Sequence, residues 1–258
     1  MLVSLAPATF RYQAHSQDDT ELSTRVRDLA TRYPRYGYRR ITALLRRTEC
    51  VNHKRVRRIW RQQKLQVKRL RRLRPRRSRS TQLQATRPGQ IWAYDFVEDA
   101  LASGRPFKVL TVMDEFTREG LALDVAHTTS AERVIGVLAA LFAQHGAPSY
   151  LRSDNGAEFV AQAVQLWLRD SGVQTLYIEP GKPWQNGKEE RFNGTVRDEC
   201  LNRFAFGSIA EACVRLNSYR HEYNSERPHS SLGYLTPHAF RAAWSEAQQN
   251  QADPLTGT

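Results

Sequence analysis

The distribution of charge divides this 258-residue chain into two unlike parts. Residues 1–90 contain 24 Lys and Arg against 5 Asp and Glu, a net charge of +19. Residues 91–258 contain 15 against 21, a net charge of −6. The densest cationic stretch, Leu70-Arg-Arg-Leu-Arg-Pro-Arg-Arg-Ser-Arg79, predicts a linker, because so many like charges repel one another until phosphates neutralise them. One compact core cannot include this stretch, so we expect at least two folded parts.

The basic front part predicts a polyanion as its partner, and DNA fits better than a membrane surface. Its helices lack the broad Trp, Phe and Leu face that inserts into lipid. No stretch reaches the ~20 apolar residues of a membrane span, and the opening residues lack the charge and length of a signal peptide. The three cysteines form no CxxC pair and no zinc spacing. We therefore expect a soluble, cytoplasmic protein that makes no membrane contact.

Three short helices are predicted within residues 1–66, with a Pro34/Gly37 turn between the first and the second. Their apolar stripes recur at helical spacing: Leu22, Val26 and Leu29; Tyr38, Ile41 and Leu45; and Val56, Ile59 and Trp60, after an Asn52 cap.

The third of these helices is strongly basic and has almost no acidic relief. Lys54, Arg58 and Arg61 share one face, with Arg55 and Arg57 beside it. This pattern is typical of a helix-turn-helix module whose third helix enters a DNA groove. A solvated charged face is the alternative, and the scarcity of acids favours DNA contact.

The chain from Ile91 onwards predicts an α/β fold with a mixed sheet. Three strand-like stretches come first, and then helices alternate with strands up to a helix that contains Glu190. A long helix with an apolar stripe from Ile209 to Tyr223 follows, and Thr236-Pro237 should open a final short helix. The expected organisation is a DNA-binding module, a basic linker, a catalytic core and a C-terminal helical extension, over residues 1–66, 67–88, 89–205 and 206–258.

Three acids stand in positions that call for a chemical explanation. Asp95 lies in the middle of the aromatic strand Ile91-Trp-Ala-Tyr-Asp-Phe-Val97, where a carboxylate is costly unless it is paired, protonated or bound to a metal. Asp154 ends an apolar stretch, and 35 residues separate it from Glu190. Three converging carboxylates repel one another unless divalent cations neutralise them. The pattern therefore indicates a two-metal site for phosphoryl transfer.

Neighbouring acids have ordinary structural explanations. Glu98 and Asp99 fall at a strand end, where solvated acids are common, and Asp114 opens a turn. Glu158 falls in the first turn of a helix, where it meets the positive end of the helix dipole.

Glu189 is the closest competitor of Glu190. Asn186 can cap this helix, which makes Glu189 its capping-box partner. Glu190 then points to another face, which it shares with Asn193 and Arg197 at i+3 and i+7.

Several motifs resemble those of a known family. WAYDFVED, LRSDNGAEF and PGKPWQNGKEERFNGTVRDECL are similar to the three acidic motifs of bacterial insertion-sequence transposases, specifically the OrfB product of the "IS-three" family, relatives of retroviral integrases. YPRYGYRRITALLRR and VNHKRVRRIWR resemble its N-terminal module, and YNSERPHSSLGYLTPHAF its C-terminal segment. The family's NG-x-x-E-S-F-N pattern also selects Glu190, and Arg191 stands where the family usually carries Ser.

This resemblance implies an RNase H-like mixed sheet flanked by helices and a DDE-type polynucleotidyl transferase. Asp95, Asp154 and Glu190 would hold two Mg²⁺ ions, or Mn²⁺, for cleavage at transposon ends and strand transfer. Further DNA contacts are expected from the front module and from the region around Glu190: Arg39, Arg40, Lys54, Arg55, Arg58, Arg61, Lys182, Trp184 and Arg197. For Trp184, a buried packing role is the equal alternative.

The family also implies partners. We expect a bacterial, nucleoid-associated protein that works as a homo-oligomer on DNA, with OrfA, the product of an upstream reading frame, as partner or fusion. Two other functions stay open, a catalytically inactive DNA-binding regulator derived from a transposase and an RNase H-like nuclease that only hydrolyses.

Overall fold

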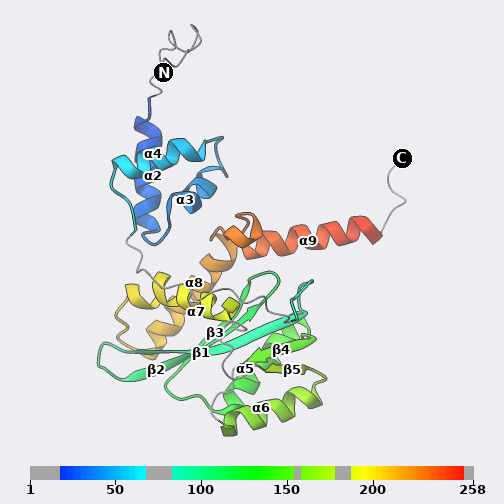
Figure 1. Ribbon diagram of the computed structural model, residues 1–258. Coiled ribbons are helices and arrows are strands. Elements are labelled where there is room, and N and C mark those ends of the chain that lie inside the picture. Colours follow the sequence, from blue (N-terminus) through cyan, green and yellow to red (C-terminus); the bar gives the residue numbers. More distant parts are fainter. Residues whose placement is uncertain (1–17, 68–82, 154–157, 178–186, 253–258) are drawn as a thin grey trace, which may run out of the picture. The chain divides into compact units, whose positions relative to one another are not determined.

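The computed structural model describes residues 18–67, 83–153, 158–177 and 187–252 (Figure 1). The chain forms two compact units, Met1–Leu70 and Arg71–Thr258. Their boundary falls inside the basic linker that the charge pattern predicts.

The described part of the first unit contains three helices around one apolar cluster. Its helices are α2 (Thr20–Arg32), α3 (Tyr38–Leu45) and α4 (His53–Gln62). The apolar stripes of the sequence meet inside it, with Val26, Ile41 and Val56 completely buried. The Asn52 side chain accepts a hydrogen bond from the backbone N–H of Lys54 at 2.9 Å, so the predicted cap of α4 is present.

A five-stranded mixed sheet forms the centre of the second unit (Figure 1). Its strands are β1 (Ile91–Ala100), β2 (Pro106–Asp114), β3 (Gly120–Ala126), β4 (Tyr150–Ser153) and β5 (Gln174–Tyr177), in the order β3-β2-β1-β4-β5. The pairs β1–β2 and β2–β3 are antiparallel, whereas β1–β4 and β4–β5 are parallel. The predicted mixed sheet is confirmed.

Helices cover both faces of this sheet. α5 (Ala131–His145) and α6 (Glu158–Asp170) pack on one face, and α7 (Gly187–Glu199) and α8 (Ile209–Ser225) on the other (Figure 1). Trp92 of β1 belongs to the α5 side, while Ala93 and Val97 belong to the α7 side. Because side chains alternate along a strand, Asp95 faces the same side as Ala93 and Val97. The side chain of Asp95 therefore points to the face of the sheet that α7 covers.

The segment after α7 completes the same core. A 3₁₀ turn, η2 (Leu201–Arg203), leads to α8, whose residues Ala212, Leu216 and Tyr223 are buried against the sheet. Past α8, Arg227 forms a buried two-pronged ion pair with Glu199 of α7, with both N–O distances 2.7 Å. A second 3₁₀ turn, η3 (Ser230–Leu232), follows.

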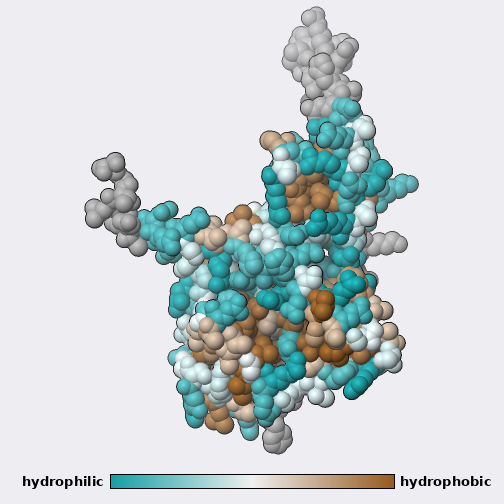
Figure 2. Space-filling view, turned by 180° about the vertical axis from the view of Figure 1, so that it is seen from behind, coloured by the Kyte–Doolittle hydropathy of each residue, from teal (hydrophilic) through white to brown (hydrophobic). Residues whose placement is uncertain are grey.

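The last helix, α9 (Pro237–Ala252), starts where the sequence predicts, and the Thr236 hydroxyl accepts from the backbone N–H of Ala239 at 3.2 Å. The expectation that it is short is wrong, since it has 16 residues. No Gly or Pro interrupts the sequence before Pro254, so nothing ends the helix early. Phe240 and Trp244 pack against Phe116, whereas the far part of α9 is exposed and hydrophilic (Figure 2).

Candidate active site

Asp95 is held in place from two directions. Its Oδ1 accepts the backbone N–H of Phe96 at 2.7 Å, and its Oδ2 accepts the side-chain amide of Asn193 at 2.8 Å. Both donors are neutral, so neither cancels the negative charge of the carboxylate. Half-buried beside α7, the group is fixed in orientation and remains suited to a cation.

One row of side chains on α7 faces β1. Glu190, Asn193 and Arg197 share this row, because residues three and four apart lie on one face of a helix. Asn193 binds Asp95, and Nη2 of Arg197 donates to the carbonyl oxygen of Glu98 at 2.5 Å. Glu190, exposed, stands one helical turn before Asn193 on the same row. Glu190 thus belongs to the helix row whose later members, Asn193 and Arg197, bind β1.

Glu189 does not have the expected capping role, and that expectation is wrong. The side chain is fully buried against the sheet, and the Thr111 hydroxyl lies 2.8 Å from its Oε1. Its Oε2 is buried with no hydrogen-bond partner among the described residues. The cause is helical phase, since Glu189 shares its face with the buried Phe192 and Val196 rather than with solvent.

The environment of Glu189 favours its neutral form. Burial raises the pKa of this carboxyl well above its usual range, although the hydrogen bond with Thr111 acts in the opposite direction. The negative charges of Asp95 and Glu115 raise the pKa further. Glu189 is therefore buried and favours the neutral form, whereas Glu190, the next residue, is exposed.

A buried ion-pair network joins the elements around this site, and sequence reasoning missed it. Glu115, just after β2, accepts from Nε of Arg152 on β4 at 2.5 Å and from Nζ of Lys188 on α7 at 2.9 Å. Arg152 also donates to the carbonyl oxygen of Leu83 at 3.1 Å. The network ties the strand that precedes Asp154 to the first turn of α7. An arginine inside the otherwise apolar stretch Tyr150-Leu-Arg-Ser153 was the available signal.

Other predicted site residues cannot be placed in this way. Asp154, Lys182 and Trp184 lie outside the described residues. β4 ends at Ser153, directly before Asp154 in the chain. Within the described ranges, no group of three or more His, Cys, Asp or Glu side chains comes together as a metal site.

Asp114 has the structural turn role that its position predicts. It is buried, and its two carboxylate oxygens accept the backbone N–H groups of Phe116, Thr117 and Gly89 at 2.7–2.9 Å. Glu98 forms an exposed pair with Lys108 at 2.9 Å, which fits a solvated acid.

More of the positive charge on the basic face of α4 is paired with an acid than the sequence suggests. Asp19, at the start of α2, pairs with both Arg55 and Arg58. The expectation of almost no acidic relief is therefore wrong for Arg55 and Arg58. Lys54 and Arg61 are exposed on the same helix.

Arg39 and Arg40, on α3, are engaged with aromatic rings. Arg39 lies over the ring of Tyr38, with 5.9 Å between the guanidinium carbon and the ring centroid, and Arg40 lies over that of Tyr36 at 5.3 Å. DNA contact by these basic residues of α3 and α4 stays a prediction.

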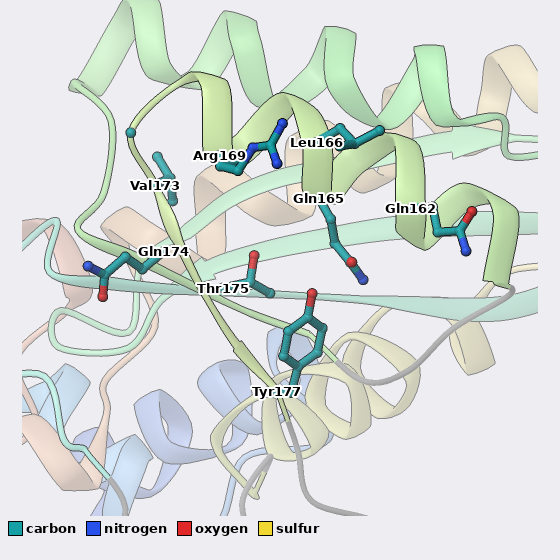
Figure 3. A pocket seen from close by; sticks show the side chains of 9 residues that line it. Gln162, Gln165, Leu166, Arg169, Val173, Gln174, Thr175 and Tyr177 are labelled. Atoms are coloured by element: carbon teal, nitrogen blue, oxygen red, sulfur yellow. The ribbon is translucent and has the colours of Figure 1, made fainter.

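The second unit also has a groove away from the acidic site. It lies between α6 and β5 and is lined by residues such as Gln162, Gln165, Thr175 and Tyr177 (Figure 3). Its volume of about 750 Å³ would hold a small ligand, but none of the described residues that line it carries a carboxylate. It cannot supply the metal chemistry that Asp95 and Glu190 indicate.

Comparison with known proteins identifies the family. Residues 85–183 and 171–237 match the Integrase core domain family, and residues 16–73 match the HTH-like domain family. The chain is 40% identical over 257 residues to an uncharacterized 39.2 kDa protein of insertion element IS476 from Xanthomonas euvesicatoria, an alignment that covers 98% of this chain and 74% of that protein. It is 27% identical over 237 residues to the transposase InsD of the IS2 elements of Escherichia coli, which covers 86% and 79%.

The two domains define an integrase-type protein with a helix-turn-helix-like module. Within that class, the chain belongs to the family of insertion-sequence transposases.

A solved structure shows the same fold. The match is a chain of the simian T-cell lymphotropic virus intasome in complex with the PP2A regulatory subunit B56 gamma, with a TM-score of 0.54 and 16% identity over 84% of this chain and 74% of that one. The predicted RNase H-like core is therefore confirmed. None of the helices in the described ranges is long and apolar enough to cross a membrane.

Proposed function

We propose that the second unit cleaves DNA at the ends of an insertion element and joins the resulting 3′-hydroxyl to target DNA. The observation that carries this proposal is the row of α7 that follows β1. Asn193 on this row binds Asp95 directly, and Glu190 precedes it by one turn. Asp95, Asp154 and Glu190 are then the three catalytic acids.

Two Mg²⁺ ions, or Mn²⁺, fit these residues. Carboxylate oxygens are the ligands that Mg²⁺ prefers, and two neutral donors, the Phe96 backbone N–H and the Asn193 amide, orient the side chain of Asp95. Asp95 and Asp154 would flank the two ions, and Glu190 would complete the ligands of the second ion. When bound, the ions lower the pKa of the attacking hydroxyl or water and stabilise the leaving oxygen.

The protein's own groups then orient the reaction. Asn193 fixes the direction of the Asp95 carboxylate, and the bond to the Glu98 carbonyl holds Arg197 beside the strand, where its charge can attract a phosphate. Water serves as nucleophile in the first step and the 3′-hydroxyl in the second, so no covalent intermediate with the protein forms.

The first unit would supply DNA affinity through α4. Its match to the HTH-like domain family and the exposed Lys54 and Arg61 support this role. An OrfA partner and a homo-oligomer on paired DNA ends belong to the same proposal, which rests on the similarity to insertion-element proteins.

A strand-transfer assay tests the proposal against its two rivals. The full chain, with or without the OrfA partner, is incubated in Mg²⁺ with a duplex that carries the element's terminal repeat and is 5′-labelled on the strand to be cleaved and joined. A transposase gives a nicked product and a joined product, and EDTA removes both. A nuclease gives only the nick, and an inactive regulator gives neither.

A further inference from the structure

Four cations lie around the first turn of α7 and the adjacent β2–β3 turn. Arg152 and Lys188 bind Glu115 directly. Arg118, in the β2–β3 turn, interacts electrostatically with Glu115 and with Arg191 of α7. We call Arg118, Lys188 and Arg191 the α7 cation cluster.

The nearby acids cannot neutralise this cluster. Each oxygen of Glu115 is already bound, one by Arg152 and the other by Lys188. The two oxygens of Asp114 accept three backbone N–H groups. Neither Arg118 nor Arg191 makes an ion pair or a side-chain hydrogen bond with a described residue. Among the described residues, positive charge therefore exceeds negative charge at this place.

Arg118 occupies a costly position. Its backbone lies in the left-handed region, with φ at 64°, where glycine is the residue without strain. Burial lowers the pKa of its guanidinium, against the raising effect of Glu115, and the charge of Arg191 lowers it as well. A half-buried cation beside a like charge is stabilised when an anion binds between them.

The cluster lies on the flank of α7 that is opposite to the catalytic row. Successive residues of a helix are about 100° apart, so Lys188 and Arg191 project to one side of the buried Phe192. Glu190 and Asn193 project to the other side. An extended anion could therefore contact the cluster and reach the catalytic row by crossing the start of α7.

We propose that Arg118 and Arg191, with Lys188, bind a phosphodiester of the DNA strand beside the scissile phosphate. This proposal rests on the proposed function and assigns a backbone contact to a face of α7 that carries no catalytic acid. It also gives a role to Arg191, the position at which the sequence departs from the family pattern.

Salt dependence of DNA binding tests the contact. The full chain is titrated by fluorescence anisotropy against a fluorescein-labelled duplex that carries the terminal repeat, in EDTA, over a series of KCl concentrations. Each lost phosphate contact lowers the slope of log affinity against log salt by roughly 0.9. Because the cations share one phosphodiester, Arg118→Gly and Arg191→Ala should each show part of this loss, and the double variant nearly all of it. Arg191→Lys should keep the wild-type slope.

The variants are chosen to separate charge from folding. Glycine relaxes the backbone at position 118, so Arg118→Gly removes the cation without adding strain. Arg191 is exposed, and its replacement alone decides the question if the position 118 variant does not fold. Arg105→Ala is the matched control, because Arg105 is an exposed cation at the other end of β2.

Two results would overturn the proposal, an unchanged slope in the double variant or an equal loss in Arg105→Ala. The assay contains no metal and measures no catalysis. Strand transfer that survives loss of Glu190 would instead count against the proposed function. The salt slopes of DNA binding would not change in that case, so the two failures can be told apart.

Discussion

The two units use charge in opposite ways. In the first unit, an apolar cluster lies inside and the charged groups lie around it, as in the pairs of Asp19 with Arg55 and Arg58. In the second unit, charged groups are buried between elements, and Arg152, Glu115, Glu199 and Arg227 are each nearly inaccessible.

This difference separates binding from positioning. Surface charge costs little to keep and is available to a polyanion, whereas buried charge is expensive and persists only when its partners are fixed. Both buried networks attach to α7, one at its first turn through Lys188 and one at its end through Glu199. The core unit thus uses its buried ion pairs to hold the helix that carries Glu190.

The largest stability effect should come from the buried pair. Arg227→Ala leaves the Glu199 carboxylate without its two-pronged partner and should lower the free energy of unfolding by about 3–5 kcal/mol, as measured by urea denaturation.

The matched control is an exposed pair of the same kind. Arg133 binds Asp124 through two N–O contacts of 2.6 and 3.0 Å on the surface, so Arg133→Ala should cost only about 0–1 kcal/mol. If both variants lost the same free energy of unfolding, burial would not determine how much an ion pair contributes to stability.

A second prediction concerns pH. The folded protein binds the Glu189 proton more tightly than the unfolded chain does, because burial raises the pKa of this group. As pH rises above the unfolded pKa, the unfolded state loses the proton first, and the wild type loses stability until the folded pKa is reached. Glu189→Gln removes this loss without a change in volume.

The advantage of Glu189→Gln over wild type should therefore grow with pH above the usual glutamate range. Unfolding midpoints at a series of pH values, taken in EDTA, measure it. An advantage that stays constant with pH would mean that Glu189 is ionised in the folded protein.

The smallest stability effect is expected at the surface of the first unit. Asp19→Asn removes the partner of Arg55 and Arg58 and should cost at most about 1 kcal/mol. The two released arginines should strengthen DNA binding and steepen its salt dependence by up to roughly 0.9 per added phosphate contact. Weaker binding by this variant would show instead that Asp19 positions these arginines for DNA.

The fold was largely predictable because its elements follow local patterns. The helical spacing of Val56, Ile59 and Trp60 and the alternation along β1 both depend only on neighbouring residues. The face shared by Asn193 and Arg197 followed from helical phase alone.

The tertiary charge pairs were not predictable in this way. Glu115 meets Arg152 across 37 positions and Lys188 across 73, and no local pattern records such partners. Glu189 was misassigned for a related reason. A capping box depends on where the helix begins, whereas its burial depends on the packing of α7 against Thr111.

The choice between two adjacent acids tests the central claim most directly. Glu190→Gln and Glu189→Gln each replace one carboxylate by an amide of the same size, on the same helix. The strand-transfer assay in Mg²⁺ should find Glu190→Gln inactive, with DNA binding retained, and Glu189→Gln active. An inactive Glu189→Gln beside an active Glu190→Gln would contradict the account and move the third catalytic acid to the buried position.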